Sequence, residues 1–261
     1  MNKIGIIGLG FVGNSINKSF NLKNIETEVY DKYKNIGTFN NILYTKFLFL
    51  CLPTPFEEIS CKYNIEEIIK TLEKLVDYKG LIILKSTIEP ETTNKLSDKF
   101  RHLKICHNPE FLTSRTAFED FHNQTHIVLG KGPNCDSIQE LYDFYHKYYP
   151  EAEISTCTAL ESESMKIFCN SFYASKIMLF NEYYLLCQKN GSDFEKIKNL
   201  MLKNNWINPM HTNVPGPDGS LGFGGACFPK DIKALNEYMK NIKSGNKVLH
   251  GVIEECEIVR K

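Results

Sequence analysis

Near its N-terminus the chain reads Gly8-Leu9-Gly10-Phe11-Val12-Gly13, a G-x-G-x-x-G pattern. An apolar run at residues 4–7, typical of a buried strand, precedes it, and an amphipathic stretch at residues 11–21 follows it. A glycine-rich turn between a strand and a helix directs backbone N–H groups and the helix dipole towards a pyrophosphate. The pattern therefore predicts a dinucleotide-binding βαβ unit; the alternative is a glycine turn in an α/β protein that binds no cofactor.

Each glycine of this turn has its own physical task. Gly8 allows the tight turn, Gly10 lets phosphates approach the backbone, and Gly13 lets the helix pack closely against the strand. We expect Phe11 and Val12, the first helical residues, to contribute backbone N–H groups to the same cofactor site.

A carboxylate follows at the distance that a dinucleotide site requires. Asp31 lies 18 residues after Gly13, at the end of the expected strand 28–30, where it can accept hydrogen bonds from ribose hydroxyls. A 2′-phosphate would meet its negative charge, so the sequence favours NAD over NADP. Lys32 and Lys34 follow directly and weaken that preference.

Short apolar runs alternate with amphipathic stretches through the first half of the chain. The expected strands are residues 3–8, 28–30, 47–52, 81–85, 104–106 and 126–129, and the expected helices are residues 11–21, 63–76 and 91–100. Such alternation predicts right-handed βαβ units. The expected fold class of residues 1–155 is therefore α/β, a Rossmann-like doubly wound parallel sheet.

The second half has a different pattern. Residues 160–188 contain no Gly or Pro and carry apolar residues near helical spacing, which predicts one long helix. Further helices are expected at 193–203, capped by Ser192, and at 231–241 and 247–260, with a turn-rich segment at 204–225. Residues 156–261 are therefore expected to form an all-helical domain.

Composition excludes some classes of function. The chain of 261 residues has 31 Lys+Arg and 31 Asp+Glu, which argues against a nucleic-acid partner. No apolar run approaches the roughly 20 residues of a membrane span, and no signal peptide is visible. The nine cysteines are odd in number and include no Cys-x-x-Cys pair, so we expect a reducing, cytoplasmic location and no metal site.

One cysteine lies in an unusual context. Residues 222–231 read Gly222-Phe223-Gly224-Gly225-Ala226-Cys227-Phe228-Pro229-Lys230-Asp231. The glycines let a substrate lie against the backbone, and Cys227 precedes a helix expected to begin near Pro229. A helix N-terminus and Lys230 would both stabilise a thiolate, which favours a nucleophile over a buried, inert thiol. Asp231 is either a simple dipole-complementing carboxylate or a group that orients or deprotonates a water.

Six segments in order resemble one family: the UDP-glucose 6-dehydrogenase / GDP-mannose dehydrogenase family of NAD-dependent nucleotide-sugar oxidases. The matching segments are residues 8–13 with Asp31, Cys51-Leu52-Pro53-Thr54-Pro55, Lys85-Ser86-Thr87, Asn108-Pro109-Glu110-Phe111-Leu112, residues 163–170 and residues 222–231. The resemblance implies oxidation of a sugar C6 alcohol to a carboxylate in two hydride transfers, with UDP-glucose to UDP-glucuronate as the favoured reaction.

The resemblance also implies residue roles. Cys227 matches the nucleophile that forms a thiohemiacetal and then a thioester, and Lys166 and Asn170 match the pair that stabilises charge on the C6 oxygen. Asp231 matches a carboxylate that helps to activate water, and Glu110 matches one assigned to thioester hydrolysis. Further matches are Thr87 for a water near C6, Thr54, Ser86 and Thr87 for the cofactor, and Phe111, Leu112, Lys166, Asn170 and Gly224 for the substrate.

Three departures from the family pattern stand out. Ser114 replaces a second glutamate beside Glu110, which puts thioester hydrolysis in doubt, and Trp206 stands where an arginine would reach a partner subunit's substrate. The family continues beyond a helix like residues 247–260 into a nucleotide-binding domain, which we expect to be absent here. The resemblance implies a homodimer through residues 160–188; the alternative is burial of that helix within one subunit.

Two other functions remain open. A β-hydroxyacid dehydrogenase would share the Rossmann domain, the long helix, Lys166 and Asn170, but would transfer one hydride and need no cysteine. A non-catalytic NAD-binding remnant is favoured by the missing domain and by Ser114, and disfavoured by retention of the catalytic set. The sequence does not identify the sugar or the base.

Overall fold

The computed structural model describes residues 3–60, 62–113 and 115–260. Ser114 and Cys61 lie outside the described residues. The chain forms two compact units, one of Met1–Pro55 with Tyr63–Lys166 and one of Phe56–Lys62 with Ile167–Lys261. The domain boundaries expected at residues 155 and 156 stay a prediction. No helix within the described ranges is long and apolar enough to cross a membrane.

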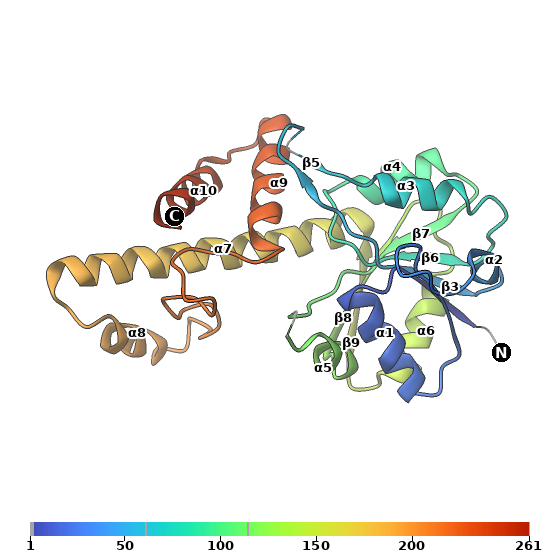
Figure 1. Ribbon diagram of the computed structural model, residues 1–261, viewed down its shortest axis with the longest axis horizontal. Coiled ribbons are helices and arrows are strands. Elements are labelled where there is room, and N and C mark those ends of the chain that lie inside the picture. The colour runs from blue at the N-terminus through green and yellow to red at the C-terminus, as the bar shows by residue number, and fades with distance from the viewer. Residues whose placement is uncertain (1–2, 61, 114, 261) are drawn as a thin grey trace. The chain divides into compact units, whose positions relative to one another are not determined.

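The first unit is built on a seven-stranded sheet with the order β2-β1-β3-β6-β7-β8-β9 (Figure 1). The strands are β1 (Ile4–Ile7), β2 (Thr27–Tyr30), β3 (Phe47–Leu50), β6 (Leu81–Leu84), β7 (Lys104–His107), β8 (His126–Lys131) and β9 (Glu153–Thr158). All neighbouring pairs are parallel except β7 with β8.

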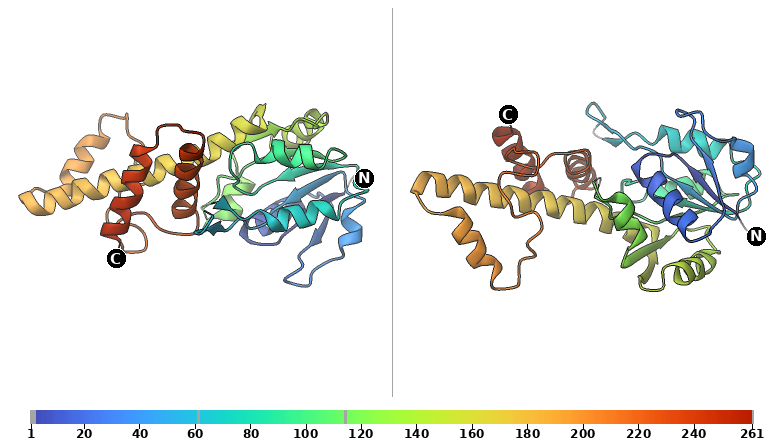
Figure 2. Two further views of the ribbon diagram at one scale, coloured as in Figure 1. Left: turned by 90° about the horizontal axis from the view of Figure 1, so that it is seen from above. Right: turned by 60° about the horizontal axis from the view of Figure 1, so that its bottom comes forward.

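Helices cover both faces of this sheet, as Figures 1 and 2 show. They are α1 (Phe11–Leu22), α2 (Phe39–Ile42), α3 (Glu66–Glu73), α4 (Thr92–Lys99), α5 (Ala117–His122) and α6 (Ile138–Tyr148). Strand residues alternate between two apolar clusters, so that Phe49 packs with α1, α5 and α6 while Leu50 packs with α2, α3 and α4. Burial on both faces explains why the strands are continuous apolar runs, and it confirms the doubly wound fold.

Two local features differ from the sequence pattern. The chain after β7 packs α5 on α1, with the rings of Phe121 and Phe20 at 5.9 Å, and it returns to the sheet as an antiparallel strand. The helix expected at residues 63–76 begins only at Glu66, because Lys62–Tyr63 forms strand β5 against β4 (Phe56–Glu57).

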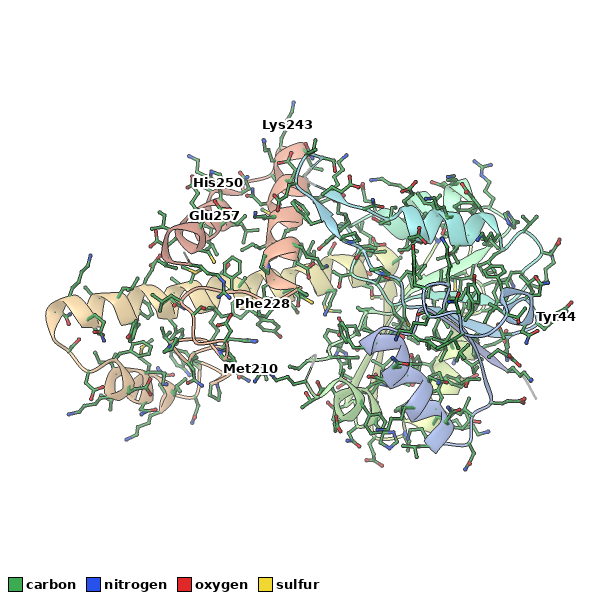
Figure 3. The ribbon with its side chains drawn as sticks, viewed as in Figure 1. Tyr44, Met210, Phe228, Lys243, His250 and Glu257 are labelled. Carbon is green, nitrogen blue, oxygen red and sulfur yellow. The ribbon has the colours of Figure 1, made fainter. Side chains whose placement is uncertain are left out.

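The second unit is helical, as expected, apart from the residues that it contributes to the β4–β5 pair. Helix α7 (Ala159–Asn190) has 32 residues and passes from the first unit into the second. Beside it in the second unit are α8 (Phe194–Leu202), α9 (Phe228–Asn241) and α10 (Lys247–Val259) (Figure 3). Ala174 and Met178 of α7 share a buried cluster with Ile232 of α9 and Cys256 of α10.

The cap predicted for α8 was wrong by one residue. Asp193, not Ser192, is the N-cap, and its side chain accepts a hydrogen bond from Lys196 N at 3.0 Å. The Ser192 hydroxyl instead donates to Asn190 Oδ1 at 2.6 Å. Both residues are good caps, so the sequence alone could not place the helix start to a single residue.

Candidate active site

The glycine-rich turn between β1 and α1 has the geometry that a pyrophosphate requires. Gly8 has a φ of +89°, and a Cβ there would lie 2.5 Å from the Cys51 carbonyl oxygen. A Cβ on Gly13 would lie 1.9 Å from the Gly8 carbonyl oxygen, whereas one on Gly10 would meet nothing within 4 Å. Gly8 and Gly13 are therefore needed for packing. Gly10, the N-cap of α1, leaves an open surface beside the helix N-terminus.

Asp31 holds this turn in place. Its Oδ2 accepts from Leu9 N at 2.7 Å, and its Oδ1 accepts from Tyr33 N at 3.0 Å and Lys34 N at 2.9 Å. Burial raises the pKa of Asp31, but these N–H donors outweigh burial and hold the pKa below its ordinary value. The carboxylate is thus ionised near neutral pH, which suits a hydroxyl-bearing ribose and disfavours a 2′-phosphate. The Lys34 ammonium donates to Leu9 O at 2.6 Å.

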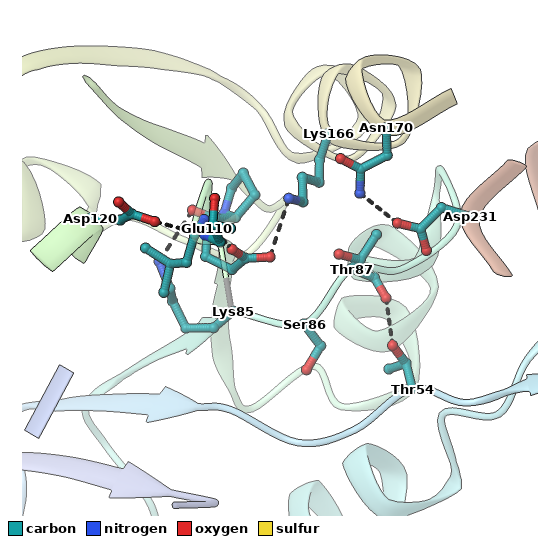
Figure 4. Close-up of polar contacts among 12 residues, drawn as sticks. Thr54, Lys85, Ser86, Thr87, Glu110, Asp120, Lys166, Asn170 and Asp231 are labelled. Atoms are coloured by element: carbon teal, nitrogen blue, oxygen red, sulfur yellow. Dashed lines mark hydrogen bonds and ion pairs between the residues drawn. The ribbon is translucent and has the colours of Figure 1, made fainter. Parts of the chain in front are cut away.

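The loops after β3 and β6 are joined by two side-chain hydrogen bonds. Thr54 Oγ1 donates to Thr87 O at 2.7 Å (Figure 4). Ser86 Oγ donates to Leu52 O at 2.5 Å. The structure therefore brings the predicted residues Thr54, Ser86 and Thr87 together at the carboxyl ends of parallel strands, where such sheets bind ligands. The Thr54 and Ser86 hydrogens are already donated, so these hydroxyls would act as acceptors towards a ligand.

Lys166 lies close to Glu110 in the first unit. Lys166 Nζ is 3.2 Å from Glu110 Oε1, and the two side chains are 7% and 11% exposed (Figure 4). Glu110 Oε2 accepts from Leu112 N at 2.6 Å, and Lys166 Nζ lies 5.4 Å from the Phe111 ring centroid. The sequence placed Glu110 and Lys166 in one site but did not predict this ion pair. Phe111 is 43% exposed, and Leu112 packs partly against the core.

Lys85, a buried lysine that the sequence placed in a matching segment without a role of its own, supports the Glu110 loop. Lys85 Nζ donates to Asn108 Oδ1 at 3.0 Å and to Pro109 O at 3.2 Å, and the Tyr145 hydroxyl donates to the same Asn108 oxygen at 2.7 Å. Burial lowers the pKa of Lys85 to about 8. The available signal was a lysine that directly follows the apolar run Leu81–Leu84.

His107 at the end of β7 is a second buried polar group near these loops. Its Nδ1 lies 2.8 Å from Ser162 Oγ, and burial lowers its pKa to about 3. The imidazole is therefore neutral at physiological pH and has a structural hydrogen-bonding role.

In the second unit Asn170, Asp231 and Lys230 form a compact polar group. Asn170 Nδ2 donates to Asp231 Oδ2 at 2.5 Å (Figure 4). Lys230 Nζ lies 2.6 Å from Asp231 Oδ1. Asp231 is fully buried in the first turn of α9. The sequence predicted Asn170 and Asp231 as catalytic, and the structure joins them directly.

Cys227 is the N-cap of α9, and the next turn contains Pro229 as expected. Asp231 N donates to Cys227 O at 3.0 Å, which closes the first turn, and the thiol is half-buried. Side chains at an N-cap lie beside backbone N–H groups that the helix itself leaves unpaired. The position therefore suits a group that carries negative charge during a reaction.

The structure shows what lies beside Gly224 and how far Trp206 is exposed to solvent. A Cβ on Gly224 would lie 2.2 Å from Arg260 Nη2, so an internal guanidinium fills the space beside this glycine. The substrate contact expected of Gly224 stays a prediction. Trp206 is 90% exposed.

A doubly wound sheet with an open glycine turn and an ionised Asp31 defines a Rossmann-type dinucleotide-binding protein, here joined to a helical unit that carries a cysteine at a helix N-terminus. The NAD binding domain model of the UDP-glucose/GDP-mannose dehydrogenase family matches residues 32–148, and the central domain model of that family matches residues 160–255. The chain belongs to the UDP-glucose/GDP-mannose dehydrogenase family, and most of the residues that match that family's NAD-binding domain lie in the first unit.

Curated relatives agree with this assignment. UDP-glucose 6-dehydrogenase of Rickettsia bellii (strain RML369-C) is 33% identical over 217 residues, which are 80% of this chain and 48% of that protein. The chain spans about half the length of the curated relatives it matches.

Two solved structures share the fold. A UDP-glucose dehydrogenase from the hyperthermophilic archaeon Pyrobaculum islandicum has a TM-score of 0.85 at 21% identity, over 99% of this chain and 68% of that chain. The 3-hydroxyisobutyrate dehydrogenase of Mycobacterium tuberculosis has a TM-score of 0.78 at 16% identity, over 97% of this chain and 92% of that chain.

Proposed function

We propose that the protein is an NAD-dependent nucleotide-sugar dehydrogenase that oxidises the C6 alcohol of UDP-glucose to the carboxylate of UDP-glucuronate. The observation that carries the proposal is Cys227 at the N-terminus of α9, four residues before the buried Asp231 that accepts from Asn170. A dehydrogenase that stops at the aldehyde has no use for a nucleophile in this position. The names of the curated relatives support UDP-glucose as the substrate.

The residues of the first unit fit NAD. The open face of Gly10 and the N-terminus of α1 would hold the pyrophosphate, and Asp31 would accept from the adenosine ribose. When bound, NAD supplies the hydride acceptor. Thr54 and Ser86 would accept hydrogen bonds from the ligand at the strand ends, since their own hydrogens are donated to backbone carbonyls.

The first oxidation requires a base and a donor at C6. Lys166 and the Asn170 amide would donate to the C6 oxygen, which stabilises negative charge as the hydroxyl loses its proton. Glu110 forms an ion pair with Lys166, so it would receive this proton, in addition to the part in thioester hydrolysis that the family resemblance implies.

Cys227 then links the two oxidations. Its sulfur forms a bond to the aldehyde carbon while its proton passes to the C6 oxygen, which gives a thiohemiacetal. Loss of a second hydride, for which a second molecule of NAD would be the acceptor, and of the hydroxyl proton leaves a thioester. Asp231 would accept a proton from the attacking water, the C–S bond breaks, and Cys227 leaves as a thiolate that regains a proton.

The test of this proposal is oxidation of a panel of nucleotide sugars by the purified protein with NAD. NADH formation and the mass of the product are followed together, with UDP-glucose, GDP-mannose and a UDP-N-acetyl sugar in the panel. The proposal expects NADH and the uronic acid from UDP-glucose. NAD reduction without any acid, or no turnover of any sugar, contradicts it.

A second candidate is a two-electron β-hydroxyacid dehydrogenase. It is favoured by the fold shared with 3-hydroxyisobutyrate dehydrogenase over most of both chains, and by Lys166 and Asn170 on one long helix. A non-catalytic NAD-binding protein is the third. Thermal stabilisation by NAD but by no nucleotide sugar or hydroxyacid would favour that last reading.

We also propose a homodimer formed through α7. Five of its exposed apolar side chains, Phe168, Phe172, Leu179, Tyr183 and Leu186, fall within about 60° on a helical wheel of 3.6 residues per turn. Such a stripe on a monomer is typical of a protein interface. The cytoplasmic location stays a prediction.

A further inference from the structure

The glycine-rich segment 221–224, which leads to Cys227, is held by side chains from two helices. Gly222 N donates to Asn181 Oδ1 of α7 at 3.0 Å, a buried contact. On the other side of the same residue, Arg260 Nη1 donates to Gly222 O at 3.4 Å and to Leu221 O at 3.1 Å. The amide and the carbonyl of Gly222 are thus both fixed by side chains distant in sequence.

Packing reinforces these bonds. Gly222 has a φ of +70°, and a Cβ there would lie 2.9 Å from Cys256 Sγ of α10. The Cys256 thiol donates to Phe223 O at 3.5 Å, and the Phe223 ring is buried. A Cβ on Gly224 would collide with the Arg260 guanidinium at 2.2 Å. Gly222 is therefore required by its positive φ and by the Cys256 side chain beside it, whereas the space beside Gly224 is filled by the mobile end of Arg260.

Arg260 makes three of these contacts at once. Its Nη1 donates to the two carbonyls, and its Nη2 forms an ion pair with the carboxylate of Asp218, three residues before Leu221. A planar guanidinium has several donors in a fixed plane, so it can serve a carboxylate and two carbonyls together. A lysine could neutralise Asp218 but could not hold both carbonyls in one geometry.

We propose that Arg260 is a positioning residue that orders segment 221–224 for substrate binding in front of Cys227. The inference rests on the proposed function. Arg260 holds the backbone that precedes the nucleophile and does not contact the reacting atoms. A loop that is already ordered when the substrate arrives saves the entropy cost of ordering it on binding. Loss of Arg260 therefore weakens substrate binding more than it slows the chemical step.

The kinetic test compares four variants with the wild-type enzyme, with UDP-glucose and NAD. Arg260→Gln removes the charge and the two-carbonyl clamp, Arg260→Lys keeps the charge, and Asp218→Asn keeps the clamp while removing the ion pair. His250→Gln changes an exposed side chain on α10, the helix that ends just before Arg260, and is the control (Figure 3). We expect Arg260→Gln to raise KM about tenfold, because a less ordered loop binds the substrate more weakly. We expect kcat to stay within about threefold of the wild-type value, because Arg260 does not contact the reacting atoms.

The other variants separate the clamp from the charge. Asp218→Asn is expected to raise KM less than about threefold, and Arg260→Lys to recover only part of the loss. A fall in kcat with KM unchanged, or an Asp218→Asn effect as large as that of Arg260→Gln, overturns the proposal.

A second readout does not depend on catalysis. The rate at which iodoacetamide alkylates Cys227 is followed by peptide mass spectrometry in the wild-type protein and in Arg260→Gln. We expect Cys227 to react about tenfold faster in the variant while Cys187, buried in another cluster of the same unit, keeps its rate. Equal acceleration at both cysteines would show general loosening, and no acceleration at Cys227 would also overturn the proposal. Failure of UDP-glucose oxidation in the wild type, with the alkylation result intact, refutes the proposed function alone.

Discussion

Cys227 combines a helix N-cap position with a neighbouring buried carboxylate, and its chemical role depends on one atom. Cys227→Ser keeps nearly the same side-chain size but replaces the thiol by a far weaker nucleophile. We expect formation of the acid to fall by roughly a thousandfold or more. Acid formation is measured by mass spectrometry, with Cys157→Ser on β9 as the control. Unchanged acid formation in Cys227→Ser would remove the nucleophile from the account.

Glu163 is a buried carboxyl group whose burial has a measurable consequence. Its Oε1 accepts from Thr93 N at 2.7 Å, while its Oε2 has no hydrogen-bond partner within the described part of the chain. Burial raises its pKa from the ordinary 4.5 to about 7. Between these two values the folded protein holds a proton that the unfolded chain has lost. Stability therefore falls as the pH rises from about 4.5 to 7, and the penalty is complete above 7.

Glu163→Gln removes this titration. We expect the variant to gain stability relative to the wild type by on the order of 3 kcal/mol between pH 5 and pH 8, at about 1.4 kcal/mol per pKa unit. Urea unfolding at the two pH values measures the difference, with the exposed Glu119→Gln as a control. A difference that is the same at both pH values would contradict the assigned pKa.

At the scale of elements, the loop between β7 and α5 depends on Lys85. Its ammonium holds Asn108 Oδ1 and Pro109 O, and Glu110 follows immediately. Lys85→Met fills the space, but Asn108 Oδ1 and Pro109 O each lose the hydrogen bond from the ammonium. We therefore expect the free energy of unfolding to fall by about 1–3 kcal/mol. We also expect kcat/KM to fall, because the Glu110 loop is released. Denaturant unfolding and steady-state kinetics check both, and a stable variant with normal kcat/KM refutes this role.

The exposed apolar stripe on α7 is the proposed dimer interface. Phe172 is 65% exposed at the middle of the stripe. Phe172→Glu places a charge in the proposed interface and is expected to convert a dimer to a monomer in light scattering. Gln188→Glu adds the same charge about 160° away on the helix and should leave the dimer intact. A wild-type monomer, or a dimer that survives Phe172→Glu, excludes this interface.

Elements with strong local patterns were predictable. Residues 8–13 and the apolar runs at β1, β3 and β6 carry their own periodicity, so the doubly wound sheet and the long helix α7 followed from the sequence. The reversal at β8 was not predictable, because it depends on α5 packing against α1. The short β4–β5 pairing, because of which α3 begins later than expected, likewise depends on contacts that no local sequence pattern predicts.

The site shows the same division. Cys227, Asp231 and the Thr54, Ser86 and Thr87 loops were found from motifs, but their partners were not. The Lys166–Glu110 pair, the Lys85 network and the Arg260 clamp each join residues far apart in sequence, and only tertiary structure brings them together. A buried lysine such as Lys85 also looks, in sequence, like any charged residue that ends a strand.

The whole molecule combines a dinucleotide-binding unit with a helical unit that supplies a cysteine, and we propose that it oxidises one substrate twice. The direct measurement is the number of NADH molecules formed per UDP-glucose consumed, with the product identified by mass. We predict two NADH per molecule of acid, with no aldehyde released. One NADH per substrate, with an aldehyde or ketone as the product, would contradict it and favour the two-electron alternative.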